Sequence, residues 1–211
     1  MRSIVEVLQR SGRWDNTLFV LTSDHGQAFG EKGIIFHTLR IDEGEIRIPL
    51  WVRYPDHSFA GEEGVGWASL IDVVPSIMKT LGCAWDSPSG VAFDQLVDRP
   101  RTDPVLTMGD GIIWKHTDNL MSPDRRRWLD RLFTAAYQGD DKVLLDATND
   151  QYSAFDVVRD SREEHDLLPG QAERLAPLMT AAKTVASRLQ QQTGAVHSAE
   201  VEDRLKSWGY I

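Results

Sequence analysis

The 211-residue sequence predicts an α/β protein in which part of a parallel sheet flanked by helices is followed by a small antiparallel sheet and a long terminal helix. Three observations predict this fold class. The apolar run at 17–23, TLFVLTS, is typical of a strand buried on both faces of a parallel sheet. Short strand-like segments between residues 105 and 158 are joined by short links, which favours antiparallel pairing. Residues 172–192 have the apolar spacing of an amphipathic helix.

Helices and strands alternate along the first 82 residues. Residues 1–12 have apolar positions at helical spacing, and a second strand is predicted over 46–54. The spacing over 68–82 predicts a helix that ends at Gly82 as its C-cap. The side chains expected on the buried side of that helix are Leu70, Val73, Val74, Ile77, Met78 and Leu81.

A stretch rich in Pro, Asp, Ser and Gly at 83–104 indicates a loop or a domain boundary. We therefore expect two domains, an α/β portion over 1–100 and a small antiparallel-sheet subdomain with its C-terminal helix over 101–211. The predicted strands of the subdomain are 105–115, 132–139, 142–147 and 153–158.

Composition restricts the classes of function. The net charge is −9, with 32 acidic residues spread along the chain, and the densest basic run at 125–127 is short. This excludes the basic stripe of a nucleic-acid-binding protein. A single cysteine, Cys83, excludes an internal disulfide and a thiolate zinc site. No apolar run is long enough to span a membrane, and the amphipathic N-terminus does not resemble a signal peptide, so we expect a cytoplasmic protein unless its natural beginning is missing.

The sequence Asp24-His25-Gly26 directly follows the first predicted strand. A carboxylate and an imidazole at the carboxyl end of a strand lie where α/β sheets bind ligands, and both are good ligands of divalent metals. Adjacent side chains on a strand point to opposite faces, so both reach one ion only if the backbone turns, which Gly26 would permit. The alternative is that Asp24 caps a helix and His25 is a polar loop residue.

A second imidazole, His37, lies in a glycine-punctuated loop before the second predicted strand. Arg40 and Lys32 belong to the same loop and could face an anion, although each alone is more often a solvated charge. Glu43 and Glu45 are expected to form local ion pairs. The loop therefore offers candidate contacts for an anionic substrate.

Several ordered motifs resemble the sulfatase family of the alkaline-phosphatase-like superfamily. The family pattern D-N-T-x-[apolar]₃-T-S-D-[NH]-G-x-x-x-G-E-x-G is similar to 15–33 (DNTLFVLTSDHGQAFGEKG). The acidic pair and R-[VI]-P-L of the family resemble residues that follow His37, and its L-x-D-[apolar]-x-P-T-[apolar] helix resembles 68–82. Its C-terminal K-[apolar]…L-Y-D-L-x-x-D-P-x-E-x-x-N-L pattern resembles 135–168, with departures at Phe155, Ser161 and Asp166.

The resemblance implies a metal-dependent ester hydrolase acting on a small-molecule sulfate or phosphate ester. By carry-over, Asp24 and His25 are two ligands of a divalent metal, with Ca, Mn, Mg and Zn all left open. His37 takes a catalytic place as a contact of the sulfuryl or phosphoryl oxygens or of the metal, and Arg40 that of a substrate-binding residue. Such groups stabilise charge that gathers on peripheral oxygens as the ester breaks.

The nucleophile motif of the family, C/S-x-P-x-R, does not occur in this sequence. The resemblance therefore predicts the C-terminal half of a sulfatase, a sulfuric ester hydrolase, with part of its metal and anion site. Two alternatives stay open. One is a phosphodiesterase or phosphonate-monoester-type hydrolase of the same superfamily, and the other is a non-catalytic fragment that docks on a separately encoded N-terminal half.

Overall fold

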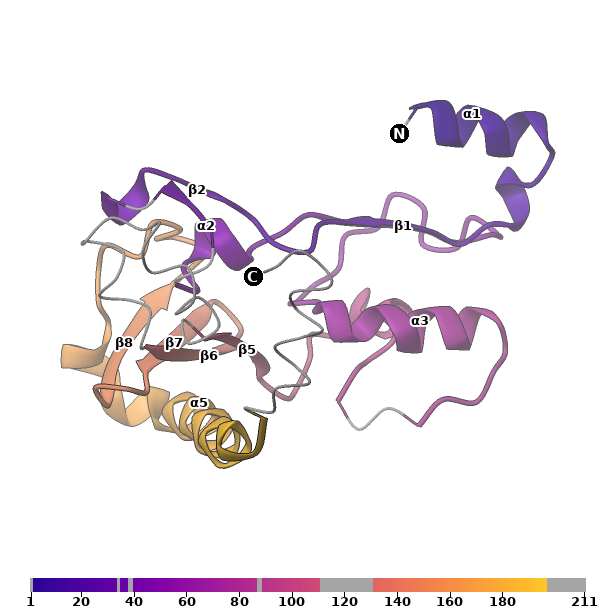
Figure 1. The fold of residues 1–211 in the computed structure, drawn as a ribbon. Coiled ribbons are helices and arrows are strands. Elements are labelled where there is room, and N and C mark those ends of the chain that lie inside the picture. Colours follow the sequence, from indigo (N-terminus) through magenta and orange to yellow (C-terminus); the bar gives the residue numbers. More distant parts are fainter. Residues whose placement is uncertain (1, 34, 38–39, 87–88, 111–130, 197–211) are drawn as a thin grey trace. The chain divides into compact units, whose positions relative to one another are not determined.

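The computed structural model describes residues 2–33, 35–37, 40–86, 89–110 and 131–196 (Figure 1). The chain forms two compact units. The first unit contains residues 1–25 and 47–103, and the second contains residues 26–46 and 104–211. The predicted end of a strand at 111–115 and the basic run at 125–127 lie outside the described residues. Among the described residues no helix is both long and apolar enough to cross a membrane, and the cytoplasmic location stays a prediction.

The first unit contains the predicted N-terminal helix and the two predicted strands. The helix α1 (Arg2–Arg10) ends before Gly12, whose φ of 66° suits glycine. Strands β1 (Phe19–Thr22) and β4 (Leu50–Arg53) pair with each other. The short helical turns are 3₁₀ segments at Trp14–Asn16, Leu70–Asp72 and Phe93–Leu96.

The pairing of β1 with β4 differs from the sequence expectation in two ways. The two strands run antiparallel, with Phe19 opposite Arg53, rather than parallel. The side chains of β1 are half-buried rather than buried on both faces, and Trp51 of β4 is 64% exposed. An apolar run indicates that a strand is suited to burial, but it does not indicate whether the neighbouring strand runs parallel or antiparallel to it.

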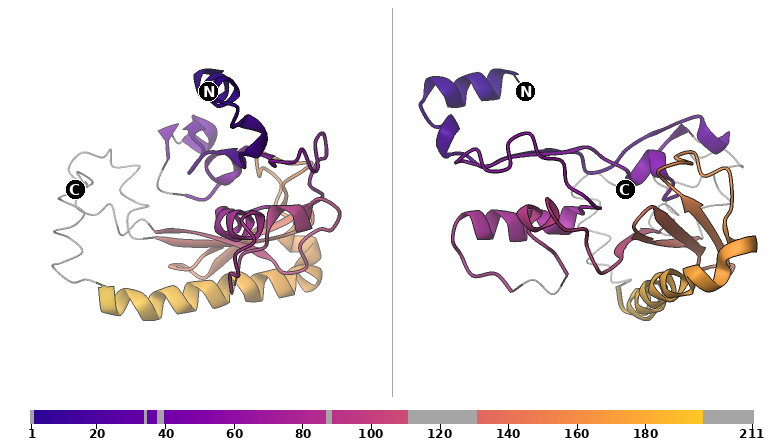
Figure 2. Two further views of the ribbon diagram at one scale, coloured as in Figure 1. Left: turned by 90° about the vertical axis from the view of Figure 1, so that its right-hand side faces the viewer. Right: turned by 180° about the vertical axis from the view of Figure 1, so that it is seen from behind.

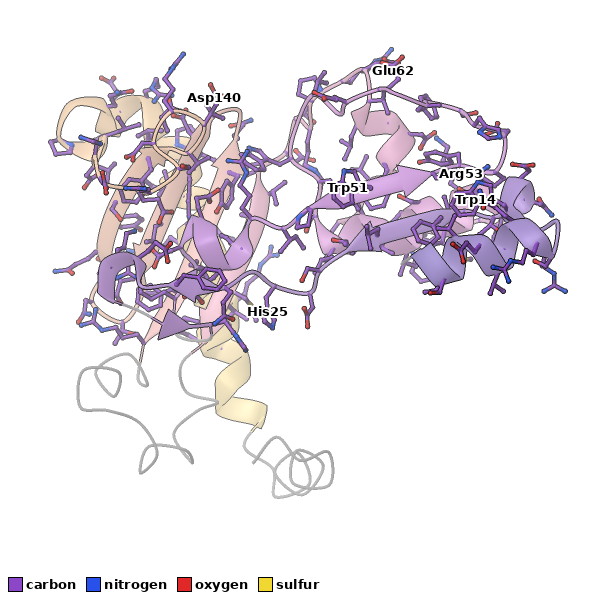
Figure 3. The ribbon with its side chains drawn as sticks, turned by 90° about the horizontal axis from the view of Figure 1, so that it is seen from above. Trp14, His25, Trp51, Arg53, Glu62 and Asp140 are labelled. Carbon is purple, nitrogen blue, oxygen red and sulfur yellow. The ribbon has the colours of Figure 1, made fainter. Side chains whose placement is uncertain are left out.

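The end of β4 is fixed to the 3₁₀ turn that precedes β1. The guanidinium of Arg53 lies 4.3 Å from the centroid of the Trp14 ring, and its Nη1 donates to the main-chain oxygen of Trp14 at 2.7 Å (Figure 3). Arg53 Nη2 also donates to Asp15 at 2.9 Å. A cation over an aromatic face combines with these hydrogen bonds to hold the two segments together.

Helix α3 (Val73–Thr80) confirms the predicted helix, and Gly82 follows it with a φ of 65°. Ser69 and Asp72 form a capping box before it. The predicted buried side is wrong, because the side chains that are buried are Asp72, Pro75 and Ser76. The exposed apolar side chains are Leu70, Ile71, Val74, Ile77 and Leu81, at 37% to 68% exposure. We call these five residues the α3 apolar face.

The second unit contains the predicted antiparallel meander. Strands β5 (Val105–Asp110), β6 (Leu132–Gln138), β7 (Asp141–Asp146) and β8 (Gln151–Asp156) pair in chain order, each antiparallel to the next. The predicted long helix is α5 (Leu168–Val196), with a break at Gln171.

The remaining segments of the second unit are β2 (Ala28–Phe29), a 3₁₀ turn (Glu31–Gly33), β3 (Ile35–Phe36) and α2 (Glu43–Ile46). Ile46, the first residue of the predicted strand 46–54, therefore belongs to α2 instead.

Each face of the four-stranded sheet is covered. Helix α5 crosses one face, and segment 26–46 lies over the other (Figures 1 and 2). Because side chains alternate along a strand, each strand contributes to both layers. The layer against α5 is a core of apolar side chains, Leu132, Ala136, Val143, Leu145, Ala154, Leu175, Leu178, Ala182 and Ala186. This two-sided burial explains why β6 and β7 are buried along almost their whole length.

Candidate functional site

Asp24 and His25 follow β1 directly, and the structure brings their side chains together. His25 Nε2 lies 3.8 Å from Asp24 Oδ2, and the Asp24 and His25 side chains are 86% and 44% exposed. Asp24 Oδ1 accepts a hydrogen bond from the His25 main-chain N–H at 3.0 Å. The described chain continues into a strand rather than a helix, so the alternative of Asp24 as a helix cap is wrong.

The electrostatics keep Asp24 ionised. Main-chain hydrogen bonds from Asp24 and His25, followed by the charge of the His25 imidazole, hold the pKa of Asp24 below its usual value. An exposed carboxylate beside an imidazole fits the donor set of a divalent metal. Among the described residues there is no cluster of three or more His, Cys, Asp or Glu that could hold a metal. The metal-binding role of Asp24 and His25 stays a prediction.

Gly26 follows this pair and has a reason for being glycine that differs from the expected one. Gly26 is not one of the described glycines that have a positive φ. A Cβ atom at Gly26 would instead lie 2.2 Å from the main-chain oxygen of Gly44. The Gly26 N–H donates to Glu45 O at 2.6 Å, and the Gln27 N–H donates to Gly44 O at 2.9 Å. Glycine therefore permits a close approach of two backbones rather than a left-handed turn.

His37 belongs to the second unit, immediately after β3. Its Nδ1 lies 3.0 Å from Gln27 Oε1. In the β2–β3 hairpin Ala28 pairs with Phe36, so Gln27 and His37 are the next facing positions. As an acceptor, the amide oxygen favours the Nδ1–H tautomer, in which Nε2 accepts when the ring is neutral and donates when it is protonated. The role of His37 toward an anion stays a prediction.

Arg40 and Lys32 both contact Asp42 in the same segment. Arg40 Nη2 donates to Asp42 Oδ1 at 2.9 Å, and Lys32 Nζ donates to the same oxygen at 2.9 Å. Burial opposes the ionisation of Asp42, but the charges of Arg40 and Lys32 outweigh it and lower the pKa of that carboxyl. Both cations are thus engaged by a carboxylate, and substrate binding by Arg40 stays a prediction.

Sequence reasoning missed a buried polar network that joins segment 26–46 to the sheet. Lys142 of β7 is fully buried and donates to the main-chain oxygen of Ile41 at 2.6 Å and to Glu163 at 2.5 Å. Tyr137 of β6 donates to Glu43 at 2.5 Å, and burial together with the Glu43 charge raises the pKa of Tyr137. Glu43 therefore contacts a residue 94 positions away and not only local partners, as was expected. The available signal was a lysine directly before the apolar run VLL of a predicted strand.

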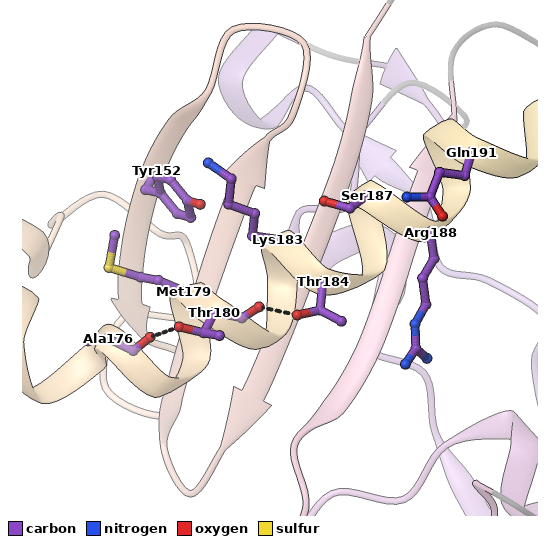
Figure 4. A pocket seen from close by; sticks show the side chains of 9 residues that line it. All are labelled: Tyr152, Ala176, Met179, Thr180, Lys183, Thr184, Ser187, Arg188 and Gln191. Carbon is purple, nitrogen blue, oxygen red and sulfur yellow. Dashed lines mark hydrogen bonds between the residues drawn. The ribbon is translucent and has the colours of Figure 1, made fainter.

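A groove of about 640 Å³ runs along α5, and none of the residues predicted from the sequence lines it (Figure 4). The Thr180 and Thr184 hydroxyls in it donate to main-chain oxygens of the same helix, and Lys183 pairs with Asp150 at 3.1 Å. Its lining is Tyr152, Ala176, Met179, Thr180, Lys183, Thr184, Ser187, Arg188 and Gln191. These two hydroxyls are thus satisfied by their own helix.

A sulfatase family model matches residues 1–83. The chain is 34% identical over 76 residues to a multifunctional alkaline phosphatase superfamily protein of Trinickia caryophylli, covering 36% of this chain and 15% of that protein. It is 31% identical over 108 residues to a choline-sulfatase of Rhizobium meliloti, covering 49% of this chain and 20% of that protein. The matched part of the chain therefore spans a fifth or less of these curated relatives.

Solved structures resemble almost the whole chain. One is a protein in complex with its substrate D-glucosamine-2-N,6-O-disulfate, with a TM-score of 0.61 and 22% identity over 92% of this chain and 38% of that one. Another is a phosphonate monoester hydrolase from Silicibacter pomeroyi, with a TM-score of 0.59 and 16% identity over 90% and 37% of the two chains. At these identities the likeness establishes the fold, and it confirms the predicted α/β fold class of the alkaline-phosphatase-like type.

Proposed function

We propose that the chain, whose residues 1–83 match a sulfatase family model, supplies part of the metal and anion site of an enzyme that hydrolyses sulfate esters. The observation that carries this proposal is the exposed Asp24–His25 pair at the end of β1, with 3.8 Å between carboxylate oxygen and imidazole nitrogen. A sulfatase model also spans these two residues.

Asp24 and His25 would hold a divalent metal through a carboxylate oxygen and a ring nitrogen. When bound, such an ion supplies positive charge that stabilises the oxygens of the sulfuryl group. His37 would contact an oxygen of an anionic substrate by donating from Nε2 in its protonated form, because Gln27 Oε1 engages Nδ1. Arg40 would bind an anionic substrate in exchange for part of its contact with Asp42.

Metal binding tests this proposal directly. We expect at least one of Mn²⁺, Ca²⁺, Mg²⁺ and Zn²⁺, at about 100 times its Kd, to stabilise the chain by about 2.7 kcal/mol. Differential scanning calorimetry would record this as a rise in Tm of several degrees, and Asp24→Ala and His25→Ala should each remove the rise. Asp56→Ala is the matched control, because Asp56 is also an ionised carboxylate that precedes a histidine, His57. A Tm that none of the four ions changes would contradict an intact metal site.

The phosphate or phosphonate ester alternative keeps support from the phosphonate monoester hydrolase that shares the fold. His25 also favours this alternative, because many family members have Asn at this position, whereas His resembles the branches that act on phosphate esters. Rates with p-nitrophenyl sulfate and with a p-nitrophenyl phosphodiester, measured with the nucleophile-bearing portion supplied, would separate the two classes of substrate.

A second candidate function is docking on a separately encoded N-terminal half, and the α3 apolar face favours it. Leu70, Val74, Ile77 and Leu81 recur at helical spacing and are exposed, although such a stripe is typical of a covered helix. Exposed apolar patches of this kind mark protein–protein contact sites. The absent nucleophile motif identifies the chemistry that the partner would supply.

Co-expression tests this docking. We expect the chain to co-purify in a 1:1 complex with the product of an adjacent upstream reading frame that carries C/S-x-P-x-R. Ile77→Lys should abolish the complex, because it places a charge in the α3 apolar face. Ile4→Lys, at an exposed position on α1, is the control and should leave the complex intact. A wild-type chain that purifies alone in this experiment would count against docking.

A further inference from the structure

We propose that Tyr137 and Lys142, on β6 and β7 of the antiparallel sheet, are positioning residues for His37, and that they act through Glu43 and helix α2. The inference rests on the proposed role of His37 as an anion contact. It assigns to the C-terminal sheet a part in shaping the site, in addition to its part in folding.

The sheet end of this connection is fixed by Lys142. Its ammonium group is fully buried and donates to Ile41 O at 2.6 Å and to Glu163 Oε1 at 2.5 Å, while Glu43 Oε1 lies 3.4 Å away. A buried ammonium costs free energy unless all its hydrogen-bonding capacity is used, so its three partners are held in one arrangement. One of these partners is the main-chain oxygen of Ile41, four residues after His37, so the contact constrains the backbone at that position.

Tyr137 makes the second contact with the same helix. Its hydroxyl donates to Glu43 Oε1 at 2.5 Å. Glu43 is 4% exposed, and its other carboxylate oxygen, Oε2, is buried with no hydrogen-bond partner among the described residues. Tyr137 and Lys142 thus both bind through one oxygen of Glu43, which makes the position of α2 sensitive to each of them.

Helix α2 passes this constraint to the hairpin that carries His37. The Gly26 N–H donates to Glu45 O and the Gln27 N–H donates to Gly44 O, so the start of the hairpin is bonded to the backbone of α2. The Gln27 side chain then reaches His37 Nδ1 at 3.0 Å. Hydrogen bonds, joined through the backbone of α2 and the side chain of Gln27, therefore connect Tyr137 and Lys142 to the imidazole.

Stability alone does not account for the network. Replacing a buried ion pair by apolar residues is often neutral or stabilising, so buried pairs are weak support for a purely stabilising role. Tyr137 and Lys142 instead both bond to residues 41–43, which follow His37 in the chain, and Lys142 bonds in addition to Glu163. This convergence favours a role in fixing the geometry of the segment.

The experiment measures the state of the His37 ring by ¹⁵N NMR of the full chain, with the His37 signals assigned by their loss in His37→Gln. In wild type we expect the Nδ1–H tautomer to dominate, because Gln27 Oε1 accepts from it. Tyr137→Phe should shift the tautomer ratio toward Nε2–H and accelerate hydrogen exchange of the Gln27 amide at least tenfold. Lys142→Met should do the same, and Glu163 keeps its ion pair with Lys32 at 2.8 Å in this variant.

Arg131→Met is the matched control, because it removes a salt bridge to Asp146 at 2.8 Å at another place on the same sheet. This variant should leave the His37 tautomer ratio unchanged even if it lowers Tm. If Tyr137→Phe lowers Tm while the ratio and the Gln27 exchange rate stay at wild-type values, the residues act only on stability and the proposal is overturned.

Titration of the wild-type chain with inorganic sulfate separates this proposal from the proposed function. If sulfate leaves the His37 signals unchanged but Tyr137→Phe shifts the tautomer ratio, the positioning holds and the anion-contacting role fails. If sulfate shifts the His37 signals and Tyr137→Phe does not change the tautomer ratio, the positioning fails and the anion-contacting role holds.

Discussion

Replacing Asp72 by alanine is expected to lower the free energy of unfolding by about 3–5 kcal/mol, which is the range for removing one partner of a buried ion pair. Asp72 is fully buried and accepts from Arg101 at 2.5 Å, from the Ser69 N–H at 2.7 Å and from the Val91 N–H at 2.8 Å. Asp72→Ala would leave the guanidinium of Arg101 buried without its carboxylate. It would also remove the cap before α3 and the anchor of the segment at Val91.

Urea unfolding followed by circular dichroism would measure this loss as a lower midpoint with an unchanged slope. Asp94→Ala is the control in the same unit, because Asp94 pairs with Lys79 at 2.5 Å but the lysine side chain is half-exposed. Its loss should be under about 1 kcal/mol. A cost of Asp72→Ala as small as that of the control would show that the buried contacts of Asp72 do not hold the first unit together.

Gly26→Ala is expected to cost about 3 kcal/mol, because it combines a steric overlap with the loss of two main-chain hydrogen bonds. The added Cβ would lie 2.2 Å from Gly44 O, and that atom is backbone that cannot rotate away. Separation of the two segments would break the bonds from Gly26 to Glu45 and from Gln27 to Gly44. Calorimetry should therefore show a Tm lower by several degrees, and the His37 tautomer ratio should change with it.

Gly44→Ala tests the same contact from its other side. The nearest atom to a Cβ at Gly44 is Gln27 O at 3.7 Å, an ordinary van der Waals distance. Since alanine is also the better helix former, this variant should be neutral or slightly stabilising. Equal Tm values for Gly26→Ala and Gly44→Ala would contradict the close-approach explanation of Gly26.

Local sequence signals predicted much of the second unit. The meander β5–β8 and helix α5 follow from apolar patterns and short links, which are properties of neighbouring residues. The network around Lys142 and Glu43 could not be predicted in this way, since it joins residues about a hundred positions apart. Periodicity identifies which strands exist but not which distant side chains their faces meet.

In the first unit, the sequence predicted a helix correctly but not which of its side chains are buried. Helix α3 was predicted correctly, yet its apolar face is exposed where burial was expected. Spacing reveals that a face is suited to burial, but what covers it is decided by other segments. For the site, the Asp24–His25 pair was identified from its place after a strand, and the structure brings its two side chains together. The metal and anion roles of Asp24, His25, His37 and Arg40 stay predictions.

The division of the chain has a consequence for how such proteins can be recombined. Segment 26–46 belongs to the second unit although residues of the first unit precede and follow it, so the backbone passes from one unit to the other at 25–26, 46–47 and 103–104. Residues 104–211 therefore cannot be exchanged between proteins as a unit of their own. A chimera that takes the four-stranded sheet from a relative would also have to take that relative's counterpart of 26–46. The reason is that the sheet and this segment bind each other through buried hydrogen bonds.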